Sequence, residues 1–373
     1  MSTTAALLLR EIGGPFTLEQ ISLGTIRNDE ALVEIHATGI CHTDLSCANG
    51  TLPASAPAVL GHEGAGVIKQ VGSDIIDLNP GDKVLLSFAH CGTCEQCTSG
   101  HPAYCNSWVP WNFGGKRPDG SAALHLEDNQ GKKELYSSFF GQSSFASLAI
   151  VHRSSLVKVK DDTNLALFAS LGCGLQTGAG AILNTLDVQP GKTVAIFGTG
   201  SVGMSAVMAA KIRGAKEIIA IDLQQSRLDL AKSLGATATI LGSDPDIISK
   251  LQEISPPNGV NYALDCSGVP AVIETMIKCL GTRGRAASVG APTPGKTVSV
   301  DVFAQLINGR EYVGCCEGDA IPDKLVPFMI EQHAEGKYPI DKLITYYDVK
   351  DFEKAISDTK SGKALKAVLK WTL

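Results

Sequence analysis

Four cysteines lie close together in this chain of 373 residues, in the segment Cys91-Gly-Thr-Cys94-Glu-Gln-Cys97 and at Cys105. Three thiols at every third position and a fourth one short loop later can converge on one tetrahedral ion. Structural zinc sites have this arrangement, with protein filling every coordination position. A redox dithiol or a disulfide cluster explains the four thiols less well in a sequence without a secretory signal. The pattern predicts a zinc lobe at residues 90–106, with His90 and His101 as rival ligands.

A second, looser set of metal-binding side chains consists of Cys41, His62 and Cys173. Three ligands would leave the fourth position of a tetrahedral zinc ion open for chemistry. From spacing alone Cys173 would be a buried thiol, because isolated cysteines usually pack as small apolar side chains. The remaining five of the eleven cysteines lie in or beside apolar sequence and receive no role.

The amino-acid composition indicates a globular protein and argues against several kinds of binding partner. Hydrophobic residues make up 44% and charged residues 19% of the chain, as in a globular protein long enough for two domains. The net charge of −6 argues against a nucleic-acid surface or a polybasic membrane patch. No stretch approaches the roughly 18 apolar residues of a membrane helix, and the apolar run at residues 5–9 predicts a strand rather than a signal peptide. We therefore expect a cytoplasmic protein with neither a nucleic-acid nor a membrane partner.

The pattern of hydrophobic residues divides the chain into a β-rich part and a part in which strands and helices alternate. Short runs at residues 31–37, 66–71 and 83–87, separated by turn residues, are typical of strands in a compact, barrel-like β fold. Further on, apolar strand-like runs alternate with helical segments. The strand-like runs lie at residues 193–197, 217–222, 261–265 and 285–289, and the helical segments at 202–212, at 226–234 and after 270. This alternation predicts a doubly wound α/β domain with a parallel sheet. After residue 318 helix and short strand return, ending in a strand at 367–371.

A glycine-rich fingerprint follows the first strand of that second part. Gly198-Thr-Gly200-Ser-Val202-Gly203 fits G-x-G-x-x-G between a predicted strand and a predicted helix, the context that a dinucleotide site requires. Its backbone can approach a pyrophosphate at the helix N-terminus. Asp222 ends the next strand, where a carboxylate accepts hydrogen bonds from a ribose and repels a 2′-phosphate, so NAD is favoured over NADP. Arg227 could offset part of that repulsion. The alternative is a glycine-rich turn in a nucleotide-free domain.

In this order, the segments around Cys41, His62 and Cys173, the cysteine lobe and the fingerprint resemble those of the zinc-dependent medium-chain alcohol dehydrogenases over essentially the whole chain. The segments 172–180 and 317–319 are most similar to the aryl-alcohol (benzyl alcohol) dehydrogenase branch. The resemblance implies a β-rich GroES-like catalytic domain made of residues 1–176 and 318–373, and an NAD-binding Rossmann domain at 177–317. It also implies NAD and two zinc ions per chain as cofactors, and a homodimer or homotetramer.

The resemblance implies a role for each residue of the metal sites. Cys41, His62 and Cys173 would bind the catalytic zinc, and the four lobe cysteines the structural zinc. Asp44 would hydrogen-bond the non-ligating nitrogen of His62, and Glu63 would lie behind the zinc.

Other residues would serve the cofactor and the substrate. Thr43 would take the alcohol proton. His42 would either contact the cofactor pyrophosphate or continue the proton relay, because Ser46 stands where many relatives have a histidine. Lys366 would lie near the pyrophosphate. The aromatic residues expected along the substrate channel are Phe88, Phe139 and Phe140.

The expected reaction is NAD-dependent oxidation of a primary alcohol, aromatic or allylic, to an aldehyde through a zinc-bound alkoxide and hydride transfer. One alternative is an S-(hydroxymethyl)glutathione (formaldehyde) dehydrogenase, which needs a cation for a glutathione carboxylate, from Lys116 or Arg117. A second alternative is a non-enzymatic structural protein that keeps the fold.

Overall fold

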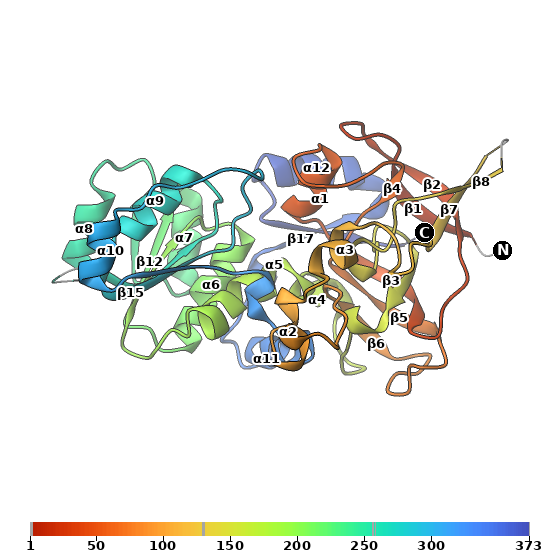
Figure 1. The fold of residues 1–373 in the computed structure, drawn as a ribbon, viewed down its shortest axis with the longest axis horizontal. Helices are drawn as coiled ribbons and strands as arrows, with labels where there is room; N and C mark the ends of the chain where they lie inside the picture. Colours follow the sequence, from red (N-terminus) through yellow and green to blue (C-terminus); the bar gives the residue numbers. More distant parts are fainter. Residues whose placement is uncertain (1–2, 129–130, 256, 258, 373) are drawn as a thin grey trace. The chain divides into compact units, whose positions relative to one another are not determined.

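The computed structural model describes residues 3–128, 131–255, 257 and 259–372, and these form two compact units (Figure 1). Unit 1 contains the described residues up to Cys173, the segment Ile321–Ile330 and the described residues from Ile340 onwards. Unit 2 contains Gly174–Ala320 and Glu331–Pro339.

Two sheets form the β-rich unit 1. The first has the strand order β4 (Ala58–Val59), β1 (Thr3–Leu9), β2 (Phe16–Leu23), β7 (Leu124–Asp128) and β8 (Gly131–Glu134). The second has the order β10 (Leu156–Lys158), β6 (Lys83–Leu86), β5 (Gly64–Val71), β3 (Glu30–Gly39), β18 (Lys366–Lys370) and β17 (Ile344–Asp348), and β9 (Leu148–His152) also pairs with β3. All these pairings are antiparallel except that of β17 with β18. The strands predicted near residues 5–9, 31–37, 66–71, 83–87 and 367–371 are confirmed.

Strand β1 has a continuous apolar sequence because both of its faces are buried. Leu7, Leu8 and Leu9 are each 0% exposed, so both faces of this strand lie inside the protein. Consecutive side chains of a strand point to opposite faces, and a strand covered on both sides therefore shows no alternation. The helices of unit 1 are α1 (His42–Ala48), α2 (Glu95–Thr98), α3 (Trp108–Phe113), α4 (Leu165–Phe168), α12 (Phe352–Lys360) and the first part of α11 (Pro322–Ala334).

Unit 2 has a six-stranded parallel sheet with helices on both faces (Figure 1). Its strand order is β13 (Ala238–Leu241), β12 (Glu217–Asp222), β11 (Thr193–Phe197), β14 (Val260–Asp265), β15 (Leu280–Ser288) and β16 (Glu311–Gly314). Its helices are α5 (Gly174–Gly180), α6 (Ser201–Ile212), α7 (Gln225–Leu234), α8 (Ile247–Ile254), α9 (Pro270–Lys278) and α10 (Val302–Asn308). The predicted doubly wound sheet is confirmed.

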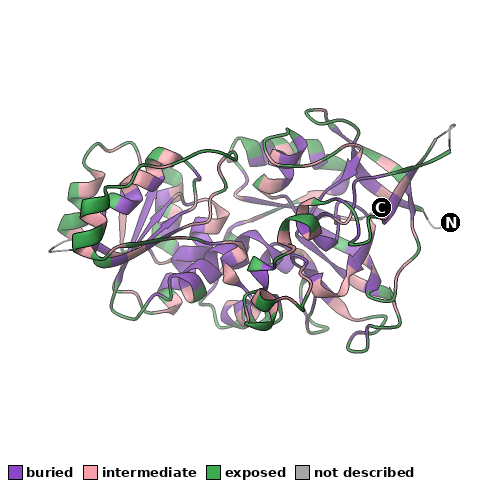
Figure 2. Cartoon of the chain, viewed as in Figure 1, coloured by how far each residue is buried: buried purple, intermediate pink, exposed green. Residues whose placement is uncertain are grey.

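The strand order creates a switch point in this sheet. The chain runs from β11 outward to β13 and then crosses back to β14 on the other side of β11. Ligands of such sheets bind beyond the carboxyl ends of the strands at this reversal. Figure 2 shows the strands buried and the outer surfaces of the covering helices exposed.

Among the described residues, no single helix is long and apolar enough to cross a membrane. The bent pair Leu165–Gly172 and Gly174–Thr185 meets that criterion only when its two parts are joined, and most of its residues are buried inside the protein.

A buried ion pair fixes the loop in front of β7. The Arg117 side chain is 7% exposed and that of Glu30 is 6% exposed. The guanidinium donates from Nε and Nη2 to the two carboxylate oxygens at 2.6 and 2.7 Å, and also to the carbonyl oxygens of Thr25 and Ala122. The neighbouring Lys116 instead forms an exposed ion pair with Glu134 at 2.8 Å.

We predict that Arg117→Met lowers the free energy of unfolding by about 3–5 kcal/mol, because it leaves the Glu30 carboxylate buried without a partner. Lys116→Met should change the free energy of unfolding by less than about 1 kcal/mol, since its ion pair is exposed. Denaturant unfolding followed by tryptophan fluorescence measures both variants. Equal midpoints for the two variants would contradict this assignment.

Candidate active site

Three chain segments bring Cys41, His62 and Cys173 together in unit 1. Cys41 lies between β3 and the first residue of α1, His62 lies just before β5, and Cys173 follows the segment after α4. The pairing of β3 with β5 places the first two segments side by side. One nitrogen of the imidazole and the two sulfur atoms all lie within 4.8 Å of one another.

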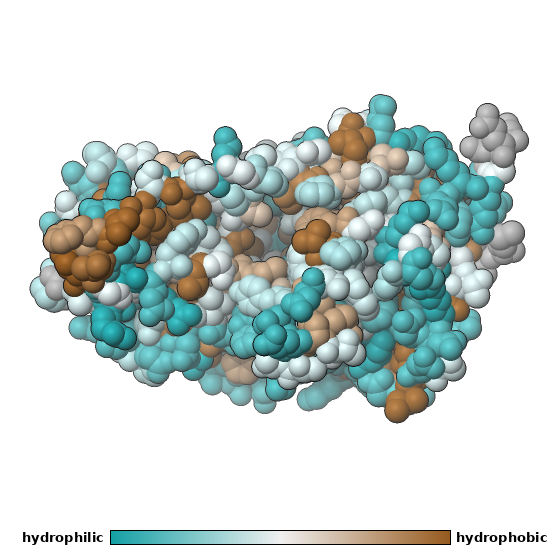
Figure 3. All heavy atoms as spheres, in the orientation of Figure 1, coloured by the Kyte–Doolittle hydropathy of each residue, from teal (hydrophilic) through white to brown (hydrophobic). Residues whose placement is uncertain are grey.

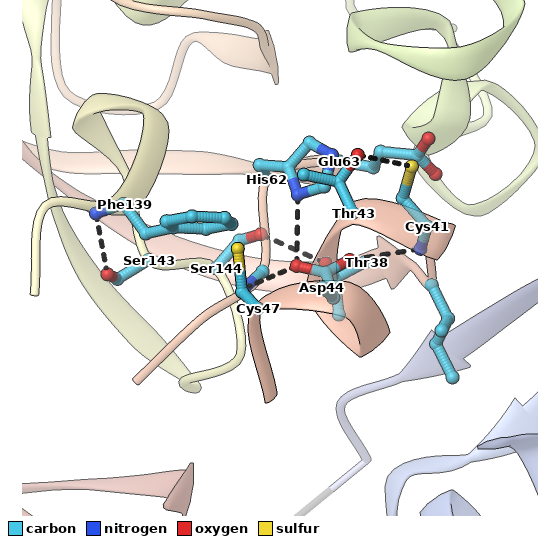
Figure 4. A network of polar contacts seen from close by, with 12 residues as sticks. Thr38, Cys41, Thr43, Asp44, Cys47, His62, Glu63, Phe139, Ser143 and Ser144 are labelled. Carbon is cyan, nitrogen blue, oxygen red and sulfur yellow. Dashed lines mark hydrogen bonds and ion pairs between the residues drawn. The ribbon is translucent and has the colours of Figure 1, made fainter. Parts of the chain in front are cut away.

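Asp44 organises this group from the first turn of α1 (Figure 4). Its Oδ1 accepts hydrogen bonds from the Gly61 amide at 3.0 Å and from His62 Nδ1 at 2.9 Å. Its Oδ2 accepts the Cys41 amide at 3.0 Å. Since a carboxylate accepts the Nδ1 proton, the lone pair of the neutral imidazole lies on Nε2.

The geometry fits a bound metal. His62 Nε2 is buried and has no hydrogen-bond partner among the described residues, a costly state for a polar atom. A hydrogen bond from Cys173 and the charge of His62 hold the pKa of the Cys41 thiol well below its usual range, although burial opposes this. Burial alone would lower the pKa of His62, but Asp44 and Cys41 outweigh it and raise that pKa well above its ordinary value. Two sulfurs and one imidazole nitrogen are donors that Zn²⁺ prefers, and a metal ion there would replace the imidazole proton.

A buried ion pair lies next to this ligand set. Lys366 Nζ donates to both carboxylate oxygens of Glu63 at 2.8 and 2.9 Å, and the two side chains are 3% and 0% exposed. Burial raises the pKa of Glu63, while the Lys366 charge opposes the rise. The sequence did not reveal this contact with Glu63, and the expected position of Lys366 near the pyrophosphate remains a prediction. The pairing of β18 with β3 carries this side chain beside Ile40, where its ammonium neutralises Glu63.

The structure places the predicted relay residues on α1. The Thr43 hydroxyl oxygen lies 3.7 Å from the Cys41 sulfur, next to the ligand set (Figure 4). His42 is exposed at the first position of the helix, and Ser46 is half-buried. The roles expected for His42 and Ser46 remain predictions.

The four lobe cysteines converge within one loop. The sulfur–sulfur distances are 3.5 Å for Cys94–Cys97 and for Cys91–Cys105, 3.9 Å for Cys91–Cys97 and 4.0 Å for Cys94–Cys105. Backbone amides point at three of the sulfurs at 3.4 Å. Burial opposes ionisation of Cys91, but the amides of Thr93 and Cys94 lower its pKa to about 6. This loop and the Cys41–His62–Cys173 group are the two sets that could hold a metal among the described residues, and His90 and His101 belong to neither.

The glycine fingerprint joins β11 to α6 as predicted. Gly198 has φ +89°, a conformation that side chains rarely adopt, and a Cβ on Gly203 would lie 2.0 Å from the Gly198 carbonyl oxygen. A Cβ on Gly200 would meet no atom within 4 Å, so space is open in front of α6, whose N-terminus no side chain caps. This space and the N-terminal dipole suit a pyrophosphate. Val202 lies in the first turn of the helix.

Asp222 is tied to the fingerprint by hydrogen bonds that the sequence did not reveal. Its Oδ2 accepts the Thr199 amide at 2.7 Å and the Thr199 hydroxyl at 3.0 Å, and its Oδ1 accepts the Gln224 amide at 3.0 Å. Arg227 lies 3.8 Å from Oδ2. The carboxylate therefore stands beside the fingerprint, where a ribose hydroxyl can reach it.

Two of the three predicted aromatic residues lie against His62. The Phe140 ring stacks on the imidazole with centroids 4.4 Å apart and planes at 24°, and Phe139 meets it edge-on at 5.4 Å. Phe88 instead lies near His90, at 6.2 Å. Gln142 donates a hydrogen bond to the His62 carbonyl, a role that the sequence does not indicate because a single amide in a polar stretch forms no recognisable motif.

Comparisons with known proteins agree with this geometry. Two family models match, the alcohol dehydrogenase GroES-like domain at residues 27–161 and the zinc-binding dehydrogenase at 201–331. A geraniol dehydrogenase of Castellaniella defragrans is 40% identical over 98% of this chain and 96% of its own length. A benzyl alcohol dehydrogenase structure from Acinetobacter calcoaceticus is 39% identical over 99% of both chains, with a TM-score of 0.95. An S-(hydroxymethyl)glutathione dehydrogenase of Saccharomyces cerevisiae is 33% identical over 95% of this chain and 93% of its own.

The chain therefore belongs to the zinc-dependent alcohol dehydrogenase family. It has the GroES-like and Rossmann folds of that family, and it is an oxidoreductase that acts on small-molecule alcohols with zinc and NAD as cofactors.

We predict that Asp44→Asn weakens zinc binding at the Cys41–His62–Cys173 set by about 10–100-fold, because an amide cannot accept all three hydrogen bonds. The lobe zinc should be unaffected. Chelator competition on the purified protein measures the two zinc equivalents separately, with Asp229→Asn on the exposed face of α7 as the control. Equal weakening of both equivalents, or of neither, would show that Asp44 does not support this set.

Proposed function

We propose that this enzyme oxidises primary alcohols bearing an aromatic ring or an allylic double bond to the corresponding aldehydes. The observation that carries the proposal is the buried, unpaired Nε2 of His62, which faces the sulfurs of Cys41 and Cys173. The geraniol and benzyl alcohol dehydrogenases among the similar proteins support this choice of substrate. The phenyl rings of Phe139 and Phe140 beside His62 support it as well, because aromatic rings favour offset and edge-on partners.

The metal-binding residues have distinct tasks in this proposal. Cys41, His62 and Cys173 hold the catalytic zinc, and the lobe cysteines hold the structural one. When bound, zinc acts as a Lewis acid on the alcohol oxygen and NAD accepts the hydride. Asp44 keeps the proton on His62 Nδ1 and so keeps Nε2 available, and Glu63 with Lys366 forms a neutral pair behind Cys41. Thr43 takes the alcohol proton at its hydroxyl oxygen.

The cofactor residues act in unit 2. The backbone of Gly198, Gly200 and Gly203 binds the pyrophosphate, and Asp222 accepts a hydrogen bond from the adenosine ribose. Unit 1 is the proposed catalytic domain and unit 2 the proposed coenzyme domain.

For the glutathione-dependent alternative, neither Arg117 nor Lys116 offers a free cation to a glutathione carboxylate. The Arg117 guanidinium is buried and binds Glu30 and two carbonyl oxygens. Lys116 pairs with Glu134 at the surface. Two S-(hydroxymethyl)glutathione dehydrogenases are nevertheless 33% identical to this chain, so this activity is the rival outcome of the test.

The test compares turnover of benzyl alcohol, geraniol, ethanol and S-(hydroxymethyl)glutathione by the zinc-loaded enzyme with NAD, followed by NADH absorbance. We expect kcat/KM for benzyl alcohol or geraniol to exceed that for ethanol by about tenfold or more, since a filled apolar pocket adds at least this much. Cys173→Ser should abolish turnover, whereas Cys279→Ser, at a buried thiol outside the site, should retain it. Preferred turnover of S-(hydroxymethyl)glutathione would overturn the proposed substrate class.

A reducing compartment suits this chemistry. All eleven cysteines are free thiols, and six of them belong to the two candidate metal sites. Because oxidation would destroy both sites, we place the protein in the cytoplasm. Fusion to a reporter and fractionation of the source cells would test this location, and recovery from an oxidising compartment would contradict it.

We propose that a second copy of the chain covers the exposed apolar face of α10. Val302, Phe303, Leu306 and Ile307 are 76%, 71%, 75% and 58% exposed, and Figure 3 shows a continuous apolar surface there. The helix packs against β15 and precedes β16 in the chain, and β16 has β15 as its one neighbour among the described strands and so leaves an edge open for pairing. An exposed apolar patch of this kind marks an interface.

Leu306→Asp combined with Phe303→Asp should convert the oligomer to monomers, because the charges cannot be buried in an apolar interface. Light scattering coupled to size exclusion measures the mass. Ile76→Asp, at a fully separate and 91% exposed apolar residue, is the control. An unchanged mass for the double variant would rule out this face as the interface.

A further inference from the structure

The orientation of the His62 imidazole needs more than one constraint. Its Nδ1 makes one hydrogen bond, to Asp44, and its Nε2 has no partner among the described residues. The covalent Cβ–Cγ bond and one hydrogen bond still allow the ring to rotate through coupled changes of the side-chain torsions χ1 and χ2. A rotated ring would move Nε2 away from the sulfurs of Cys41 and Cys173. Another contact must therefore hold the plane of the imidazole.

Two phenyl rings supply contacts to that plane. Phe140 lies nearly parallel to the imidazole, at 4.4 Å between centroids and 24° between planes. Phe139 presents its edge at 5.4 Å and 83° (Figure 4 shows Phe139 beside His62). All three rings are buried, at 0–2% exposed. A flat surface against a flat ring resists rotation in a way that an aliphatic side chain does not.

The backbone that carries these phenyl rings adopts a rare conformation. Ser138, Phe140 and Ser143 have φ values of 56°, 52° and 51°, in the left-handed region that residues other than glycine seldom occupy. Hydrogen bonds hold it there. The Ser143 hydroxyl accepts the Phe139 amide at 3.0 Å and donates to the Val59 carbonyl at 2.7 Å. The Ser155 hydroxyl donates to the Phe140 carbonyl at 3.1 Å. Such strained segments cluster at functional sites.

The same segment also forms a hydrogen bond to the backbone of His62. The buried Gln142 amide donates from Nε2 to the His62 carbonyl at 3.0 Å and to the Ser87 carbonyl at 2.9 Å. Its Oε1 accepts the Gly64 amide at 3.2 Å. One short segment therefore holds both the main chain and the ring of the same histidine.

Helix α3 packs its aromatic side chains against the Phe140 ring. Trp108 and Phe113 meet the Phe140 ring in T-shaped contacts at 5.7 and 5.2 Å. The helix itself is fixed by Asn112, which is 0% exposed and whose amide both accepts from the Ala89 amide and donates to the Ala89 carbonyl at 2.9 Å.

We propose that Phe140 is a positioning residue for the metal ligand His62. Its ring keeps Nε2 directed at the sulfurs of Cys41 and Cys173 before a metal binds and slows the loss of the metal afterwards. This inference rests on the proposed function, because it assumes that these three residues hold the catalytic zinc. It gives Phe140 a task that is distinct from lining a substrate channel.

The experiment follows zinc release from the purified holoenzyme to an excess of a chromogenic chelator. Phe140→Leu removes the flat ring and keeps an apolar side chain, and Phe113→Leu removes a ring of the same cluster that touches Phe140 but has no ring contact with His62. We expect Phe140→Leu to release one of the two zinc equivalents at least about tenfold faster than wild type, in line with other residues that support metal ligands. The second equivalent, and both equivalents in Phe113→Leu, should leave at nearly the wild-type rate. Phe140→Tyr should restore slow release.

A second readout separates positioning from packing. The visible spectrum of the cobalt-substituted enzyme should shift in Phe140→Leu and not in Phe113→Leu, because only the first variant changes the ligand geometry. Should Phe140→Leu not fold, Phe140→Met gives the same comparison. Equal release rates and identical cobalt spectra for the two leucine variants would overturn the inference while leaving the proposed function intact. A wild-type protein that holds no zinc at this set would instead overturn the proposed function.

Discussion

The Asp44 carboxylate is the interaction on which the rest of the site depends. It collects hydrogen bonds from the Cys41 amide, the Gly61 amide and His62 Nδ1, and so joins the start of α1 to the segment before β5. The carboxylate is 0% exposed, and these donors compensate for its burial. Without it, the β3–β5 pairing would still bring the two loops together, but the His62 ring would lose its hydrogen bond to the start of α1.

Two kinds of metal site follow from two kinds of chain geometry. The lobe gathers Cys91, Cys94, Cys97 and Cys105 from one loop, and backbone amides of that loop donate to the sulfurs of three of them. Such a site needs little from the surrounding fold. The Cys41–His62–Cys173 set draws on three distant segments, and it forms only because the β3–β5 pairing and the segment after α4 bring them together. A set of three ligands assembled by the fold can leave one position for a substrate, which a closed loop of four ligands cannot.

Much of this could be predicted from the sequence because the patterns were local or repetitive. The runs at 193–197 and 217–222 coincide with β11 and β12, since strands buried on both faces show continuous apolar sequence. Strand β2 has mixed burial, and no comparable run marks it. The fingerprint carries its own context in the strand before it and the helix after it.

The remaining features depend on contacts between distant residues. Lys366 was expected at the pyrophosphate by resemblance, and its pairing with Glu63 depends on the register of β18 against β3. Two hydrogen bonds, from Thr199 to Asp222 and from Gln142 to His62, join residues that are distant in sequence. Neither residue pair lies in a motif that would indicate the contact.

The most direct test of the account is X-ray absorption at the zinc edge, on protein whose lobe zinc alone is retained and on protein with both sites filled. The difference between the two spectra isolates the second metal ion. For that ion we predict two sulfur ligands, one imidazole nitrogen and one oxygen ligand from solvent, and loss of the nitrogen contribution in His62→Ala. A spectrum with four sulfur ligands per zinc in both samples, or no second zinc bound, would contradict it.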